Sequence, residues 1–310
     1  MEYVKLHNTD LKISRLIFGC EPLGGTDWGK IDENLLEKAI NQAINLGINC
    51  FDVADVYGLG RAEERLSQIL GPKRHDSVII SKFGVNWEKP IGKARAKTFL
   101  DCSPKRVVNA LENSLKRLKL DCISVYLIHW PDPKTPIQET LEALLQCQTE
   151  GKIRYFGVSN FPLTLLQEAH QNISIPIVEL QYNLIDRSPE QHLLNYSQQE
   201  KINVLGYGAL AQGLLTGKFN SDTRFEKDDR RHRLPNFRPD VLGKNLQIID
   251  KLKILGQRHG KTPSQVAIRW ILDNPSISAT IVGAKNPQQI TNNVGALDWQ
   301  LTDEELMELN

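Results

Sequence analysis

The sequence predicts an α/β fold, a (β/α)8 TIM barrel formed by residues 1–310 as a single domain. Short runs of β-branched residues alternate with helical patterns from residue 16 almost to the end, which is typical of repeated βα units around a parallel sheet. Eight such runs can be counted. None of them has the polar face of an edge strand, so a closed barrel explains the pattern better than an open sheet. No stretch of the chain has the composition of an interdomain linker.

The repeat can be followed element by element. The predicted strands are residues 16–19, 48–52, 78–82, 123–129, 155–159, 178–182, 204–207 and 280–283. Between them, apolar residues recur at helical spacing behind proline or acidic starts. This pattern predicts helices over residues 33–46, 104–118, 137–150, 162–170 and 189–199.

Three segments lie outside the eight repeats. Residues 3–14 alternate apolar and polar side chains around a turn, which predicts a β-hairpin that plugs the bottom of the barrel. Thr302 followed by Glu305 is typical of a capped helix start and predicts an extra C-terminal helix. Residues 209–243 are rich in glycine, proline and charge, and predict a long loop. At this length a lid or binding loop is expected, with a mobile surface excursion as the alternative.

The composition argues against several classes of partner. A net charge of +1 gives no attraction to nucleic acid or anionic membranes, and no apolar run approaches the roughly 20 residues of a membrane span. The N-terminal residues lack a secretory pattern, so a cytoplasmic location is expected. Five scattered cysteines without a CxxC pair favour reduced, mostly buried thiols over disulfides or a metal site. The oligomeric state is left open.

Three of the predicted strands end at a titratable residue. The second, third and fourth strands end at Asp52, Lys82 and His129, and Tyr57 lies in the loop after the first of these. Taken singly, each residue has a structural explanation, such as a helix cap or a packed ring. Because a barrel brings the C-terminal ends of all its strands to one rim, we expect the four side chains to meet in one cavity.

Such a set suits the reduction of a carbonyl group. An unperturbed tyrosine, with a pKa of about 10, is a weak acid at neutral pH. We expect the Lys82 ammonium to lower the pKa of Tyr57, and Asp52 to keep Lys82 charged, so that Tyr57 acts as the general acid. His129 is expected to donate a hydrogen bond to the carbonyl oxygen as charge develops there. The reaction also requires a hydride source beside these groups.

Motifs spread along most of the chain resemble the aldo-keto reductases. They are residues 51–58 (FDVADVYG), 81–84 (SKFG), 128–132 (IHWPD), 151–161 (GKIRYFGVSNF) and 181–183 (QYN). The resemblance implies a (β/α)8 barrel with a nicotinamide cofactor bound across its rim. It also implies a catalytic tetrad of Asp52, Tyr57, Lys82 and His129.

The same resemblance implies the cofactor contacts. Ser159, Asn160 and Gln181 match residues that hold the nicotinamide carboxamide, and Tyr207 matches the ring that stacks on the nicotinamide. The remaining positions match the loop over the pyrophosphate and the segment around the adenosine; they are Leu210, Gln212, Lys218, Gly283, Lys285, Gln289 and Asn293.

The choice of cofactor depends on two of these positions. Lys285 is the candidate contact for a 2′-phosphate, which implies NADPH. Gln289 stands where the family often has arginine, so NADH is the alternative.

Three tryptophans lie in loops on the predicted catalytic rim. Trp28, Trp87 and Trp130 are expected to line the substrate pocket, as an apolar wall or as a stacking face for a sugar ring. The sequence therefore predicts an NADPH-dependent reductase of a small-molecule aldehyde or ketone. The first alternative is an NAD-linked dehydrogenase of a sugar or alcohol, and the second is a non-catalytic subunit that senses the cofactor and regulates a partner.

Overall fold

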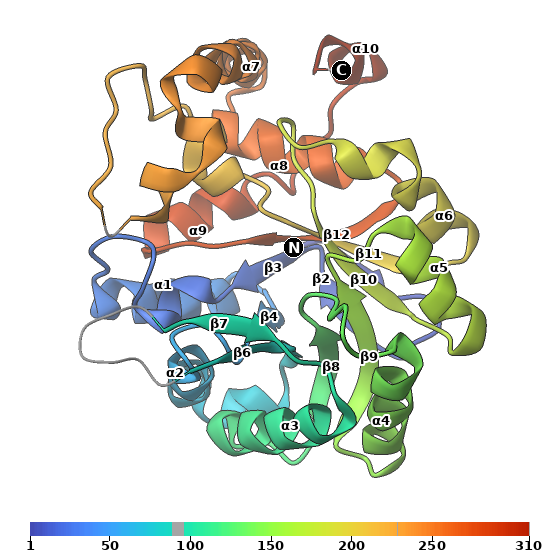
Figure 1. Cartoon of the computed structure of the whole chain (residues 1–310). Coiled ribbons are helices and arrows are strands. Elements are labelled where there is room, and N and C mark those ends of the chain that lie inside the picture. Colours follow the sequence, from blue (N-terminus) through green and yellow to red (C-terminus); the bar gives the residue numbers. More distant parts are fainter. Residues whose placement is uncertain (89–95, 228, 310) are drawn as a thin grey trace.

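Eight parallel strands close into a barrel with helices around it (Figure 1), in a computed structural model that describes residues 1–88, 96–227 and 229–309. The ring order is β10-β11-β12-β3-β4-β5-β8-β9. The strands are β3 (Leu16–Gly19), β4 (Cys50–Asp52), β5 (Val78–Phe83), β8 (Ile123–Ile128), β9 (Ile153–Ser159), β10 (Ile177–Gln181), β11 (Asn203–Tyr207) and β12 (Ile277–Val282). The predicted barrel is confirmed, and every predicted strand is found with ends that differ by at most three residues.

The helices around the barrel follow the repeat. They are α1 (Glu33–Asn45), α2 (Arg61–Leu70), α3 (Pro104–Leu118), α4 (Ile137–Thr149), α5 (Leu163–Asn172), α6 (Leu193–Gln199), α7 (Pro239–His259), α8 (Pro263–Asp273) and α9 (Pro287–Val294). One predicted helix is divided. Over residues 189–199, a 3-10 turn, η3 (Ser188–Gln191), precedes α6, because His192 between them has non-helical backbone angles.

The N-terminal hairpin closes one end of the barrel, as predicted. Its strands β1 (Tyr3–Lys5) and β2 (Lys12–Ser14) pair in antiparallel fashion. Asn203, at the start of β11, accepts a hydrogen bond from the His7 backbone N–H at 2.8 Å and donates one to the His7 carbonyl at 2.9 Å. These bonds hold the hairpin against the N-terminal ends of the strands, so the C-terminal ends form the opposite, open rim.

The predicted C-terminal helix is α10 (Asp303–Leu309). The Thr302 backbone N–H donates to Glu305 Oε2 at 3.0 Å, and the Glu305 N–H donates to Thr302 Oγ1 at 3.3 Å. This reciprocal pair satisfies two N–H groups of the first turn that have no partner within the helix.

The segment over residues 209–243 is more ordered than its composition indicates. It contains three short 3-10 helices, η4 (Ala211–Thr216), η5 (Arg230–Arg233) and η6 (Pro235–Phe237), and α7 begins inside it. The rings of Phe219, Phe225 and Phe237 pack edge to face at centroid distances between 5.0 and 5.7 Å. This aromatic cluster gives the segment a small apolar core, which a reading of helical periodicity does not detect.

Alternation along the strands decides which side chains reach the barrel interior. The buried apolar residues form two clusters, one inside the barrel and one between the strands and the helices. The inner cluster includes Cys50, Ile80 and Leu127. Because side chains alternate with a period of two, Asp52, Lys82 and His129, each two residues further along, point inward at the open rim.

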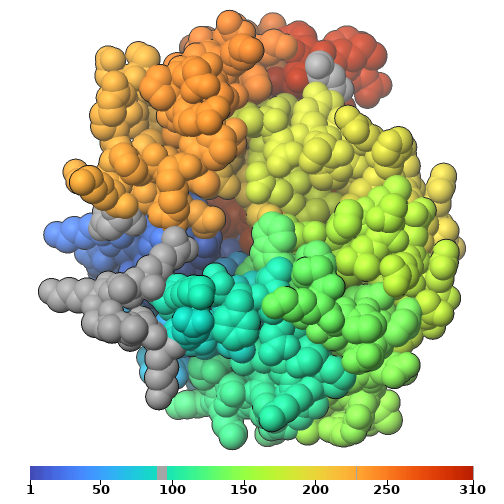
Figure 2. Space-filling view, in the orientation of Figure 1, coloured from blue at the N-terminus to red at the C-terminus, as the bar shows by residue number. Residues whose placement is uncertain are grey.

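The face that carries the open rim has an additional hairpin. Strands β6 (Val85–Trp87) and β7 (Thr98–Leu100), which follow β5, form an antiparallel pair that the sequence did not indicate. Figure 2 shows that this face is hollowed near its middle, beside the teal atoms of this hairpin. In the part of the chain that the structure describes, no helix is long and apolar enough to cross a membrane.

Candidate active site

The four predicted catalytic residues converge at the open rim. The Lys82 side chain is fully buried, and its Nζ lies 2.5 Å from Asp52 Oδ2. The same Nζ lies 5.6 Å from the centroid of the Tyr57 ring. The rings of Tyr57 and His129 meet edge to face, with centroids 5.8 Å apart and an interplanar angle of 84°. The predicted juxtaposition of the four residues is therefore present.

Local backbone geometry places Tyr57 over the rim. Gly58 has a φ of +61°, and a Cβ atom there would lie 2.4 Å from the Gly24 carbonyl oxygen. Glycine is required because the turn is left-handed and packs directly against the 3-10 helix η1 (Glu21–Gly24). The turn at residues 58–60, which precedes α2, thus fixes where the Tyr57 ring enters the site.

Two hydrogen bonds of Asp55 hold the base of the same loop. The Asp55 backbone N–H donates to the Lys82 carbonyl at 3.2 Å, and Asp55 Oδ2 accepts from Arg106 of α3 at 3.1 Å. Burial, and then the nearby Glu63 carboxylate, raise the pKa of Asp55 to about 8 even though Arg106 opposes this. Asp55 was not among the predicted site residues, although it lies two residues before Tyr57 and inside the same motif.

Opposing effects determine the charges of Lys82 and His129. Burial alone lowers the pKa of Lys82, but Asp52 and Glu179 outweigh burial and hold that pKa above its usual value. Burial, and then the Lys82 charge, lower the pKa of His129 well below its usual value. The site therefore combines a charged ammonium with a neutral imidazole, whose Nδ1 has no hydrogen-bond partner among the described residues.

The expectation that the pKa of Tyr57 lies below its usual value is wrong. Burial, followed by the charges of Asp52, Glu21 and Glu179, raises the pKa of Tyr57 well above its usual value. Burial of the ring is the main reason, because it disfavours the charged phenolate, and the nearby carboxylates add to this effect.

Glu179 is a second acidic residue of this site, besides Asp55, that the sequence analysis missed. It is the third residue of β10, 3% exposed, and its Oε2 lies 3.4 Å from Lys82 Nζ. The sequence does carry a signal for this residue. Val178 and Leu180 face outward, and because side chains alternate along a strand, the acidic residue between them must point into the barrel.

The predicted nicotinamide contacts form a hydrogen-bonded chain along the rim. Asn160, with a φ of +61°, donates from Nδ2 to the His129 carbonyl at 2.9 Å and to Ser159 Oγ at 3.0 Å. The Tyr207 hydroxyl donates to Asn160 Oδ1 at 2.7 Å. Ser159, Asn160 and Tyr207 are thus held together beside His129.

Two amide side chains flank Gly208, which follows β11. A Cβ atom at Gly208 would lie 3.5 Å from Gln181 Cγ and 3.8 Å from Gln212 Nε2. Gln212 itself has a left-handed backbone, which kinks η4. The structure therefore brings Gln181 and Gln212 together at the ends of β10 and β11, next to the partly buried Leu210.

Cationic side chains gather beside the ends of β11 and β12. Burial, and then the charge of Arg231, lower the pKa of both Lys218 and Lys285. Asp229 balances only part of this charge, through its ion pair with Arg231. Like charges held together in a partly buried place form a site suited to a phosphate group.

The other predicted adenosine-end residues lie around the same place. Gly283 follows β12, and the Lys285 backbone N–H donates to Gln289 Oε1 at 2.7 Å. Gln289 lies in the first turn of α9, and Asn293 is buried further along that helix. The N-terminus of α9 thus faces the loop that carries Lys285.

The first loop and the long segment after β11 are clasped together. Arg230 pairs with Glu21 at 2.5 Å, and Arg233 pairs with Asp27 at 3.0 Å. Trp28 lies within this clasp: its carbonyl accepts from Lys285 Nζ at 2.6 Å, and its ring centroid is 5.4 Å from the Arg230 guanidinium carbon.

The three predicted substrate tryptophans occupy different surroundings. Trp28 lies beside the cationic cluster, Trp87 on β6 has its ring 5.6 Å from the Arg106 guanidinium carbon, and Trp130 is 44% exposed. No ring contact within the described ranges joins them. Their shared role in a substrate pocket remains a prediction.

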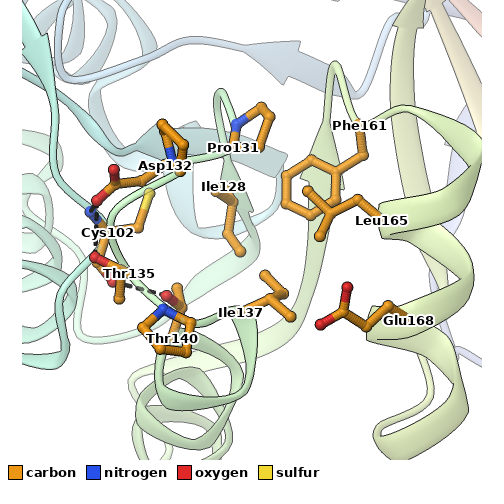
Figure 3. A pocket seen from close by; sticks show the side chains of 12 residues that line it. Cys102, Ile128, Pro131, Asp132, Thr135, Ile137, Thr140, Phe161, Leu165 and Glu168 are labelled. Carbon is orange, nitrogen blue, oxygen red and sulfur yellow. Dashed lines mark hydrogen bonds between the residues drawn. The ribbon is translucent and has the colours of Figure 1, made fainter.

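A separate cavity of about 540 Å³ lies on the helix side of the strands (Figure 3). It is bordered by the loop after β8, α4 and α5, and Ile128 and Phe161 on its wall belong to the outer cluster. None of the four tetrad residues lines it, so it is distinct from the site at the rim.

The open rim of the closed (β/α)8 barrel holds a buried lysine–carboxylate pair, a tyrosine and a neutral histidine. This combination is that of a barrel oxidoreductase. Residues 15–310 match the model of the Aldo/keto reductase family, and the chain belongs to this family. It is therefore an oxidoreductase that acts on carbonyl groups with a nicotinamide cofactor.

Individual relatives resemble the chain over nearly its whole length. Aldo-keto reductase YhdN of Bacillus subtilis is 34% identical over 100% of this chain and 93% of its own length. The NADH-specific methylglyoxal reductase of Escherichia coli is 30% identical over 98% of this chain and 95% of its own. The solved structure of a glycerol dehydrogenase from Gluconobacter oxydans superimposes with a TM-score of 0.91 at 35% identity, covering 99% of this chain and 93% of that one.

Proposed function

We propose that the chain uses NADPH to reduce a small-molecule aldehyde or ketone to an alcohol, with Tyr57 as the general acid. The observation that carries this proposal is the convergence of Asp52, Tyr57, Lys82 and His129 at the open rim.

The residues divide the work as follows. When bound, the nicotinamide cofactor supplies the hydride. His129, being neutral, donates an N–H to the carbonyl oxygen and orients it. Tyr57 then transfers its hydroxyl proton to that oxygen, and Lys82 stabilises the phenolate that remains. Asp52 anchors the Lys82 ammonium at 2.5 Å.

The rim offers suitable groups for both ends of the cofactor. Ser159, Asn160 and Gln181 would hold the carboxamide, because their hydroxyl and amide groups both donate and accept hydrogen bonds. Tyr207 would stack on the nicotinamide. The pyrophosphate and the adenosine would lie beside the cationic cluster of Lys218, Arg231 and Lys285. The other contacts to this part of the cofactor would come from Leu210, Gln212, Gly283, Gln289 and Asn293.

A second candidate is an NAD-linked dehydrogenase of a sugar or alcohol. Gln289 is its main support, because a neutral amide that already bonds the Lys285 backbone adds no charge for a 2′-phosphate. The names of two relatives, an NADH-specific reductase and a glycerol dehydrogenase, are compatible with it. We favour NADPH because three cations gather at the adenosine end.

Replacing Lys285 with methionine distinguishes the two cofactors. Lost charge-assisted bonds to a 2′-phosphate should raise the Kd for NADPH about tenfold or more, while the Kd for NADH changes little. Binding can be measured by titration calorimetry or by quenching of tryptophan fluorescence. The exposed Lys244 on α7, changed to methionine, serves as the matched control.

Two results would overturn this assignment. One is a wild-type chain that binds NADH more tightly than NADPH. The other is an equal loss of both cofactors in Lys285→Met, which would indicate that Lys285 acts only by holding the Trp28 loop.

A further inference from the structure

The barrel interior holds a second carboxyl group beside Lys82, on the wall opposite Asp52. In the ring of eight strands, β10 lies four places from β4 in either direction. Lys82 reaches both walls, because its Nζ is 2.5 Å from Asp52 Oδ2 and 3.4 Å from Glu179 Oε2. The other Glu179 oxygen, Oε1, accepts from Ser159 Oγ at 3.4 Å. Defined contacts therefore hold Glu179 in the site.

Among the described residues, Lys82 is the only cation that pairs with these two carboxyl groups. If both were ionised, the dry interior would carry a net negative charge, which is costly in a medium of low polarity. Burial, and then the Asp52 charge, raise the pKa of Glu179 well above its usual value, although Lys82 opposes this. The titratable groups that face Glu179 are Cys50 and Asp52 on β4, Tyr57 in the loop after β4, Lys82 on β5, and Tyr207 on β11.

The charge on Glu179 also affects the pKa of Tyr57. Burial, Asp52, Glu21 and Glu179 are the causes that raise the pKa of Tyr57. When Glu179 carries a proton, the Lys82 ammonium faces a single carboxylate inside the barrel. When Glu179 is ionised, two carboxylates oppose the ammonium, and a phenolate at Tyr57 loses its stabilisation.

We propose that Glu179 is a positioning residue that works in its protonated form, holding the Lys82 ammonium between opposite walls so that Lys82 can stabilise the Tyr57 phenolate. Ionisation of Glu179 switches this stabilisation off and slows proton donation by Tyr57. The inference rests on the proposed carbonyl reduction, in which Tyr57 is the acid.

The test is the pH dependence of kcat for carbonyl reduction in the wild type, Glu179→Gln and Glu142→Gln. The wild type should decline in two steps as pH rises, first as Glu179 ionises and later as Tyr57 does. A glutamine mimics the protonated carboxyl group and cannot ionise, so the first decline should disappear and half-maximal kcat should move up by about one pH unit or more. Glu142 is exposed on α4, and its variant should keep the wild-type profile.

A second measurement does not require turnover. A carboxyl group with a raised folded pKa contributes stability that is fully present below its unfolded pKa, about 4.3, and is lost as pH rises toward the folded pKa. The difference between the Tm of Glu179→Gln and the Tm of the wild type should therefore become more positive as pH rises from about 4.3 toward the folded pKa of Glu179. Glu179→Met, also uncharged, should show the same trend if the glutamine variant folds poorly.

The outcomes separate the two proposals. A wild type that reduces carbonyls with a pH profile identical to that of Glu179→Gln overturns the role of Glu179 alone. A Tm difference that does not change with pH also overturns it. A wild type that reduces no carbonyl at any pH overturns the proposed function, and this inference with it.

Discussion

Tyr57→Phe is expected to lower kcat for carbonyl reduction by about 10²–10⁴-fold, the usual contribution of a positioned general acid. The phenyl ring keeps the edge-to-face contact with His129, so the variant removes one hydroxyl group and little else. The Kd for NADPH should stay within about twofold, since the proposed cofactor contacts lie on other strands. Steady-state kinetics over a panel of aldehydes and ketones, together with a binding titration, would measure both quantities.

Tyr155→Phe is the matched control for this loss. The Tyr155 hydroxyl also makes defined hydrogen bonds, to Asp10 at 2.8 Å, but it lies at the closed end of the barrel with the N-terminal hairpin. Its variant should keep normal kcat. A Tyr57→Phe enzyme that retains more than about a tenth of wild-type kcat would contradict the assignment of Tyr57 as the acid.

The barrel could be predicted because two periodicities agree along the chain. Strands such as β3 and β5 appear as short apolar runs, and their alternation decides which residues face inward. For the same reason the meeting of Asp52, Lys82 and His129 at one rim follows from the sequence: each stands two residues beyond an inward-facing apolar residue.

What could not be predicted depends on contacts between distant segments. The order in residues 209–243 comes from three phenylalanine rings and from the clasp between Arg230 and Glu21, neither of which has a local pattern. The strand period indicates that Glu179 points inward, but not that it meets Lys82 from the other side of the barrel. The pKa of Tyr57 was predicted in the wrong direction because the sequence does not show how deeply the ring is buried, nor that several carboxylates rather than one lie near it.

Lys82→Met should be the most damaging single change to the site. Removing the ammonium leaves two buried carboxyl groups without a cation, and breaking a buried pair from one side costs about 3–5 kcal/mol of unfolding free energy. We also expect kcat to fall by at least about 10²-fold, because the Tyr57 phenolate loses its nearest positive charge. Denaturant unfolding and steady-state kinetics would measure the two losses.

The stability loss in Lys82→Met should depend on pH. Buried carboxyl groups without a cation take up protons as the chain folds. The unfolding free energy of the variant should therefore be closest to that of the wild type below pH about 4, and the difference should grow as pH rises. Lys152→Met is the control, because Lys152 forms ion pairs with Glu112 and Glu150 at a partly exposed place, and its Tm should stay near that of the wild type.

A double variant separates the structural role of Lys82 from its catalytic role. In Lys82→Met/Asp52→Asn, Glu179 is the one ionisable carboxyl group among the described partners of position 82 that remains, and its burial favours the protonated form. Stability should therefore recover in large part, while kcat stays as low as in Lys82→Met. Recovery of both would contradict a direct role for the ammonium in catalysis, and recovery of neither would mean that position 82 is needed mainly for packing. We therefore expect a double variant that is stable but inactive, because Lys82 neutralises the Asp52 carboxylate in the fold and stabilises the Tyr57 phenolate in the reaction.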